Sequence, residues 1–318
     1  MSDSGTYDEL LGQEIMSCTE VYSALNSENH PCNQIVNWQS TVLPQLRGLK
    51  TFDLSAAQRP EPWAGNLAQA QILFLGSNPS FNPDELFPDY SEEWDDAEKL
   101  RDFAARRFEG SKERPFGASD GPTERLQDRV YLNNRKLGLG GKVTHWNELR
   151  GNVAAILEKS KSEVSPNHDY VMTELVHCKS TKEGGVQSAL KFCTQKYLSS
   201  IFNASSAKLV FVLGVTPGKQ FASLFPEVPA EWGKWTENGV SHGDWPESNA
   251  ELIARRADGS WTSKEQLKHT TEISLGGSLR TVIWFPRPGR PAWPRSLGGA
   301  NCPVEPEVLE LWRSKLSK

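Results

Sequence analysis

The stretch QILFLGSNPS at residues 71–80 constrains the chain most, because a short apolar run stops there on a turn-forming cluster. A continuous apolar run bounded by Gly and Pro is typical of a strand buried on both faces of a sheet. Gly76 permits close backbone approach and Pro79 fixes the turn, so Asn78 is expected at the carboxyl end of that strand. Open α/β sheets bind ligands at this end. The sequence therefore predicts a functional site around Asn78.

Three more apolar runs are predicted to be strands, at residues 170–177, 207–214 and 280–285. Segments with helical spacing lie between them, and alternating strands and helices favour a parallel sheet covered on both faces. The sequence therefore predicts an α/β fold, a three-layer α/β/α sandwich around a central, mainly parallel four-stranded sheet. In such a sheet, polar residues at three strand ends converge on one cleft. These residues are Asn78, Glu174, Cys178 and Arg287.

The chain has no internal repeat and no low-complexity tract, so a single domain over residues 1–318 is expected. A helical lead-in is expected at about residues 1–60. Long loops are expected at about residues 110–141 and 226–275, which are rich in glycine and charge. Loops of this length would frame a wide pocket.

The formal net charge of −5 argues against a chain that binds polyanions over its whole surface. Four arginines nevertheless fall in a stretch without acidic residues and predict a local basic surface: Arg280, Arg287, Arg290 and Arg295. No apolar run approaches the roughly 18 residues of a membrane span, and the N-terminal residues lack the basic and apolar regions of a signal peptide. We therefore expect a cytoplasmic protein with no membrane partner, whose cysteines are thiols or metal ligands rather than disulfides.

Several motifs, in this order, resemble the uracil-DNA glycosylase superfamily over roughly residues 63–300. The first strand ends in Gly-Ser-Asn-Pro-Ser, similar to the superfamily's Gly-x-(Asp or Asn)-Pro-x. The second ends in Thr-Glu-Leu-Val-His-Cys, similar to a Thr-Asn-Val-Val-Lys-Cys-like segment of the iron–sulfur branch, and Cys193 follows at nearly that branch's spacing. The third ends in Leu-Gly, and Arg287-Pro288 stands where the superfamily has a His-Pro loop. Their order and spacing together are more specific than any one motif.

By this resemblance, Asn78 would hold the water that attacks the glycosidic bond of a base flipped out of DNA. The backbone amides of Ser77 and Ser80 would bind a carbonyl group of that base, and Phe81 would stack on its ring. The residues implied in base binding around the turn are Gly76, Ser77, Pro79, Ser80 and Phe81. The alternative is an asparagine chosen only for its turn.

Glu174 stands where the iron–sulfur branch has asparagine. An asparagine amide pairs with O4 and N3–H of uracil, whereas a carboxylate accepts hydrogen bonds and donates none. A carboxylate suits an exocyclic amine such as N4 of cytosine, so this residue predicts a cytosine-type base. The alternative is that the Glu174 side chain points elsewhere, since side chains alternate between the two faces of a strand.

Arg287 stands where the resemblance implies a histidine that donates to the leaving pyrimidine. Arginine is always charged and favours phosphate or a developing anion. Arginine and proline recur through this loop, which we predict to follow the DNA backbone; a role at the leaving base is the alternative. The residues predicted to bind DNA are Arg287, Pro288, Arg290 and Arg295.

Two interpretations of the cysteines stay open. The resemblance to the iron–sulfur branch implies Cys178 and Cys193 as ligands of a [4Fe-4S] cluster, and Cys18 and Cys32 would complete its four thiolates. However, the sequence lacks the N-terminal Cys-x-x-Cys of that branch, and buried free thiols are common in proteins. Free cysteines are therefore the favoured interpretation.

By the resemblance, the chain is expected to be a monofunctional DNA glycosylase that hydrolyses the N-glycosidic bond of a modified pyrimidine and leaves an abasic site, with no required cofactor. The expected partner is DNA that contains a modified base, such as a glucosylated hydroxymethylcytosine in phage DNA, which would make this an antiviral defence enzyme. The alternatives are a uracil-DNA glycosylase of base-excision repair, a non-catalytic sensor of modified DNA, and a hydrolase of free nucleosides. We infer no obligate protein partner.

Overall fold

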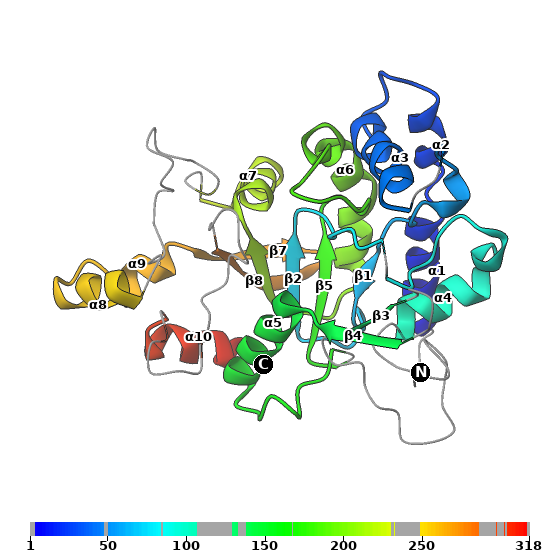
Figure 1. Cartoon of the computed structure of the whole chain (residues 1–318). Coiled ribbons are helices and arrows are strands. Elements are labelled where there is room, and N and C mark those ends of the chain that lie inside the picture. The colour runs from blue at the N-terminus through cyan, green and yellow to red at the C-terminus, as the bar shows by residue number, and fades with distance from the viewer. Residues whose placement is uncertain are drawn as a thin grey trace.

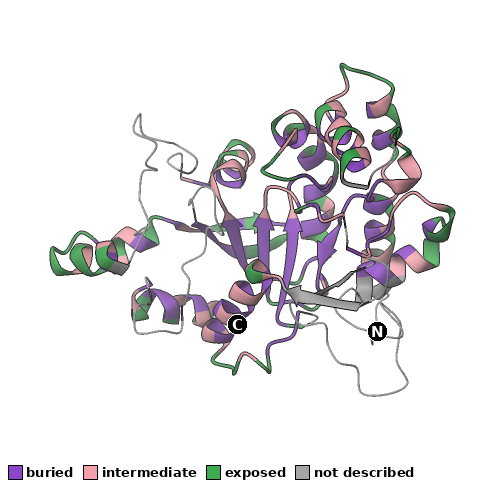
Figure 2. Ribbon diagram, viewed as in Figure 1, coloured by how far each residue is buried: buried purple, intermediate pink, exposed green. Residues whose placement is uncertain are grey.

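A computed structural model describes residues 4–47, 50–83, 85–106, 129–132, 138–166, 168–229, 232, 249–285, 297, 302 and 304–316. One sheet lies at its centre, and helices pack on both of its sides (Figure 1). The chain is thus an α/β protein, and the strands of the sheet are largely buried between the two helical layers (Figure 2).

The central sheet has six strands in the order β1-β5-β2-β6-β8-β7. Its strands are β1 (Trp63–Ala64), β2 (Ile72–Gly76), β5 (Tyr170–Glu174), β6 (Leu209–Leu213), β7 (Thr270–Leu275) and β8 (Ser278–Phe285). The four predicted strands are the inner four, and they run parallel to one another. The two edge strands, β1 and β7, are antiparallel to their neighbours.

The prediction of a four-stranded sheet was therefore wrong, because two edge strands complete a mixed sheet. Strand β1 has only two residues, too few for a periodic pattern to mark it. Strand β7 is joined to β8 by a tight hairpin, in which Gly276 and Gly277 take φ values of 59° and 73°. Glycine adopts such left-handed backbone conformations without steric cost, so consecutive glycines between apolar runs are themselves a hairpin signal.

Two apolar clusters fill the space between the sheet and its helices. On one face, valine and leucine side chains of the inner strands pack against α1 (Ser4–Met16), α2 (Glu20–Leu25), α3 (Asn33–Arg47), α6 (Val186–Ala204) and α7 (Val215–Leu224). On the other face, aromatic and apolar side chains pack against α5 (Thr144–Leu157) and α10 (Pro306–Leu316), with a contribution from α8 (Asn249–Ala257). These clusters explain why continuous apolar runs became the inner strands, because each of those strands is covered on both faces.

Helices α1, α2 and α3 occupy most of the described residues of the segment that was expected to be a helical lead-in. Helix α4 (Ala97–Arg106) packs on α1, where Phe103 and Met16 share a small apolar cluster. Two short 3-10 helices, Leu54–Ala56 and Glu92–Trp94, complete the connections on this side.

The two segments expected as long loops contain regular structure. The first holds the antiparallel pair β3 (Arg129–Leu132) and β4 (Gly138–Lys142). The second holds α8, α9 (Ser263–Leu267) and strand β7. In β7, Ile273 and Leu275 are buried while the residue between them is exposed, so one face of this edge strand joins the core. Partial burial of that kind leaves a weak signal in a segment otherwise rich in charge.

Candidate active site

The site lies where the chain leaves β2 and β5 side by side. Gly76 and Glu174 are register partners at the ends of these strands. The pairing then continues past both strands, since Val176 N donates to Ser77 O at 3.0 Å and Ser180 N donates to Pro79 O at 3.2 Å. Backbone hydrogen bonds therefore fix the predicted turn against the segment that follows β5.

Asn78 uses its side-chain amide to hold this arrangement. Its Nδ2 donates to Ser180 Oγ at 3.0 Å, to Pro79 O at 3.1 Å and to Cys178 O at 3.5 Å. The Oδ1 atom is then the part of the side chain left for a water molecule. The side-chain amide of Asn78 thus stabilises the turn against the segment that follows β5. The role of Asn78 in holding a water molecule stays a prediction.

Glu174 turns its carboxyl group over Gly76. A β-carbon on residue 76 would lie 2.0 Å from Glu174 Oε2, so only glycine leaves room for this carboxyl group. The Oε2 atom is buried and has no hydrogen-bond partner among the described residues. Burial raises the pKa of Glu174 well above its usual range, and the nearby charges of Glu61 and Glu183 raise it further.

The raised pKa favours the neutral, protonated form of the Glu174 carboxyl group. The interpretation from the sequence used a carboxylate that only accepts hydrogen bonds, and burial together with the neighbouring carboxyl groups disfavours that charged form. A neutral carboxyl group offers one O–H donor and one carbonyl acceptor. Glu174 can thus make a two-point contact with a planar ligand at the end of the sheet.

The other residues of the turn differ in how accessible they are. Ser80 is exposed and Pro79 is buried. The ring of Phe81 is only 7% exposed and meets the Trp38 ring edge-on, with 5.5 Å between the ring centroids. Phe81 belongs to an apolar cluster beneath the turn, together with Leu43 and Ala57. Its predicted stacking on a base stays a prediction, and the structure places most of its surface against protein.

A buried lysine in the segment that follows β5 forms ion pairs with two glutamates. Lys179 is fully buried, and its Nζ lies 3.1 Å from Glu61 Oε2 and 3.3 Å from Glu85 Oε2. The same Nζ lies 3.5 Å from the centroid of the Phe87 ring. The sequence analysis missed this cluster, because no local pattern links residues so far apart along the chain.

Glu183 is a second acidic residue that the sequence analysis missed. It is exposed, and its Oε1 accepts a hydrogen bond from Ser77 Oγ at 2.5 Å. Its Oε2 accepts one from Thr216 Oγ1 at 3.3 Å. Thr216 lies in the first turn of α7, directly after β6. Glu183 thus spans the carboxyl ends of neighbouring strands.

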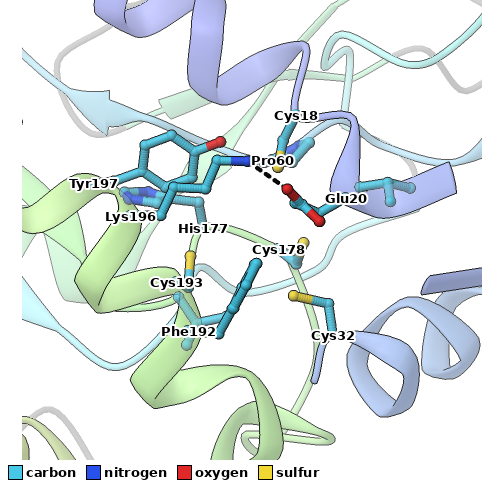
Figure 3. Close-up of a pocket in the computed structure, with 12 residues that line it drawn as sticks. Cys18, Glu20, Cys32, Pro60, His177, Cys178, Phe192, Cys193, Lys196 and Tyr197 are labelled. Atoms are coloured by element: carbon cyan, nitrogen blue, oxygen red, sulfur yellow. Dashed lines mark hydrogen bonds and ion pairs between the residues drawn. The ribbon is translucent and has the colours of Figure 1, made fainter. Parts of the chain in front are cut away.

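Four cysteines from four separate segments line one pocket. Cys18 follows α1, Cys32 precedes α3, Cys178 follows β5 and Cys193 lies in α6. Figure 3 shows their side chains around a common space. Cys178 also links this pocket to the turn, because its carbonyl oxygen accepts from Asn78 Nδ2.

The four thiols match the ligands of a [4Fe-4S] cluster in number and type. Burial raises the pKa of Cys32 and of Cys193 to about 12 and that of Cys178 well above its usual range; for each thiol, charge on other cysteines of the pocket adds to the effect. Deprotonating them together therefore requires a compensating positive charge, which an iron–sulfur cluster supplies. In the described residues, no three His, Cys, Asp or Glu side chains converge on a position for a single metal ion. A cluster takes one thiolate on each of four irons, so its ligands need not converge on one atom.

The predicted DNA-binding residues, Arg287, Pro288, Arg290 and Arg295, lie outside the described residues. Arg280, which was expected on the same basic surface, is buried. Its Nη2 donates to Phe202 O at 2.7 Å and to Ser205 O at 2.6 Å. Arg280 therefore ties β8 to the C-terminal end of α6 and adds nothing to a basic surface.

A comparison with known protein families finds no match to this chain, and a comparison with curated proteins finds none either. Over the residues that the structure describes, no helix has both the length and the apolar character needed to cross a membrane.

Proposed function

We propose that this chain is a DNA glycosylase that removes a modified cytosine from DNA and leaves an abasic site. The observation that carries the proposal is the carboxyl group of Glu174 at the carboxyl end of β5, beside the Asn78 turn, whose buried Oε2 atom has no hydrogen-bond partner among the described residues. Ligands bind at this end of open α/β sheets, and an unpaired buried polar atom there needs a partner. The resemblance of the turn to uracil-DNA glycosylases, and with it a fold of their kind, belongs to this proposal.

A neutral Glu174 complements the Watson–Crick edge of cytosine. Its carbonyl oxygen accepts from the N4 amine, and its O–H donates to N3. A neutral carboxyl group also matches N3–H and O4 of uracil, but N3 of cytosine is the more basic acceptor. Cytosine bases are therefore the proposed substrates, with the glucosylated hydroxymethylcytosine of phage DNA, and hence antiviral defence, as the specific case. Removal of uracil in base-excision repair is the alternative.

The cysteine pocket supports a cofactor in this proposal. Cys18, Cys32, Cys178 and Cys193 would hold a [4Fe-4S] cluster, which would tie together the segments that carry them. The cluster is therefore preferred over free thiols, which the sequence alone favoured. The reason is that Cys18 and Cys32 share the pocket with Cys178 and Cys193 despite their wide spacing along the chain. The chemistry proposed for the base does not pass through the cluster.

One observation favours a second candidate function, a sensor that binds a modified base without cleaving it. The Asn78 amide is engaged in the turn, and an amide is a poor base for activating water. A sensor would use the carboxyl group of Glu174 for recognition and would need no activated water.

The test is to incubate the anaerobically purified protein with duplex and single-stranded DNAs that carry uracil, cytosine, hydroxymethylcytosine or glucosylated hydroxymethylcytosine. Abasic sites are then detected by alkaline cleavage. We expect abasic sites in the glucosylated DNA, and loss of its selective recognition in Glu174→Ala. Tight binding of one modified DNA without abasic sites would identify the sensor, and abasic sites in uracil DNA alone would identify the repair enzyme.

A further inference from the structure

Glu183 carries an ionisable carboxylate across the candidate site. Its two oxygens accept from Ser77 Oγ, on the turn after β2, and from Thr216 Oγ1, on the first turn of α7. Gln187 Nε2 in turn donates to Thr216 Oγ1 at 3.3 Å. These hydrogen bonds fix the direction of the carboxyl group. Glu183 thus holds a positioned carboxyl group above the ends of β2 and β6.

The backbone that presents Glu183 is strained. Lys182 and Glu183 take φ values of 52° and 57°, a left-handed conformation that costs energy for residues with a β-carbon. Gly185 follows at φ 76°, and a β-carbon there would lie 2.4 Å from Ile35 N. The loop is therefore pressed against α3. Strain of this kind persists when the surroundings fix it, and it is concentrated at functional sites.

The other described acidic groups near the turn are in ion pairs or have a raised pKa, so they are less suited to accept a proton. Glu61 and Glu85 pair with Lys179, and burial raises the pKa of Glu174. Asn78 carries no titratable group. Glu183 is close enough for its charge to raise the pKa of Glu174. Glu174 thus has a buried carboxyl oxygen and a raised pKa, while the carboxyl group of Glu183 is exposed and hydrogen-bonded. Two carboxyl groups in such unlike environments can take the roles of acid and base.

We propose that Glu183 is the general base of the reaction and that Glu174 is its general acid, which rests on the proposed glycosylase function. Glu183 takes a proton from water as the water oxygen forms a bond to C1′ of the sugar. The bond from C1′ to the base nitrogen breaks, its electron pair leaves with the base, and Glu174 gives its proton to N3. The products are the free base and an abasic sugar with a hydroxyl group at C1′. Proton exchange with solvent then restores both carboxyl groups.

The experiment measures single-turnover cleavage at saturating enzyme, with the DNA that the wild-type protein cleaves in the base panel. Glu183→Gln should lower the rate constant by about 100-fold or more, the usual contribution of a general base. Binding of the same DNA should change by no more than about twofold, because glutamine still accepts from Ser77. The wild-type rate constant should fall at low pH (the acid limb of its pH profile), and this fall should be absent in Glu183→Gln.

Glu183→Gly is a second variant, in which glycine adopts the observed φ without steric cost. Added formate should restore part of its activity, since formate supplies a carboxylate where the side chain is missing. Glu158→Gln and Glu158→Gly are matched controls, because Glu158 also has a left-handed backbone, at φ 55°, but caps α5 instead. Both should cleave at the wild-type rate and show no response to formate.

The outcomes separate the two proposals. Wild-type protein that produces no abasic site in any DNA overturns the glycosylase function, and the role of Glu183 with it. Active wild-type protein together with Glu183→Gln at a rate within about threefold of it overturns the role of Glu183 alone. An unchanged acid limb in Glu183→Gln, or loss of activity in Glu183→Gly that formate does not relieve, also counts against Glu183 as the base.

Discussion

Glu174 Oε2 occupies the space above Gly76 that a side chain would otherwise fill. A β-carbon on residue 76 would lie 2.0 Å from this oxygen, closer than any real contact. The glycine of the turn motif is therefore required for a reason beyond backbone flexibility. It makes room for the Glu174 carboxyl group, which we propose recognises the base through hydrogen bonds.

Gly76→Ala should uncouple folding from activity. The β-carbon would displace the end of a flexible side chain, so the free energy of unfolding should fall by about 1–3 kcal/mol, which leaves the variant folded. The displaced carboxyl group of Glu174 would lose its two proposed hydrogen bonds to the base, so the cleavage rate should fall at least about tenfold. Thermal melting and the abasic-site assay measure the two effects. In the control Gly151→Ala, the nearest neighbour of the new β-carbon is Lys161 Nζ at 3.7 Å, and activity should be unchanged.

Glu174→Gln should change how stability depends on pH. The folded chain holds the Glu174 proton more tightly than the unfolded chain, whose pKa is near 4.5. The stabilisation is therefore complete below pH 4.5 and is lost as the pH rises toward the folded-state pKa. In this window the wild-type protein should lose up to about 1.4 kcal/mol per pH unit relative to Glu174→Gln.

Chemical denaturation of both proteins at several pH values between about 5 and 8 measures this difference. Parallel curves for the two proteins would show that Glu174 is ionised in the folded chain. That result would remove the neutral acid from the proposed recognition of cytosine.

Lys179→Met should be strongly destabilising. Removing the buried cation leaves the carboxylates of Glu61 and Glu85 buried without their partner. The expected loss is about 3–5 kcal/mol in the free energy of unfolding. The control Lys315→Met breaks a more exposed pair with Glu272, and it should cost no more than about 1 kcal/mol. Equal losses of unfolding free energy in the two variants would show that the buried cluster stabilises the fold no more than the exposed pair does.

Cys193→Ala should prevent binding of the proposed [4Fe-4S] cluster. Anaerobically purified wild-type protein should be brown and contain about four iron and four sulfide ions per chain. Cys193 lines the pocket with the other three cysteines, whereas Cys302 packs near the opposite face of the sheet. Cys193→Ala should therefore lose iron and melt at a lower temperature, and Cys302→Ala should keep both properties. Colourless wild-type protein after reconstitution with iron and sulfide would restore the interpretation of free thiols.

The inner part of the sheet could be predicted from the sequence because its causes are local. An apolar run such as residues 71–76, ended by a glycine, has few folds other than a buried strand. The turn at Asn78 followed from the same pattern. The order of the inner strands, β5-β2-β6-β8, was not predicted, because it depends on how the strands pair across the sheet. The two-residue strand β1 could not be predicted, because its pairing with β5 depends on the rest of the sheet.

The chemistry of the site was decided by the tertiary structure. Ser77 and Glu183 are 106 residues apart in the chain, and only the neighbouring ends of the strands bring them within 2.5 Å. The raised pKa of Glu174 results from burial and from carboxyl groups of two other segments. The sequence determined which residues could ionise and which stretches had to be buried. Long-range packing decided which of them meet, because burial and charge act through space and not along the chain.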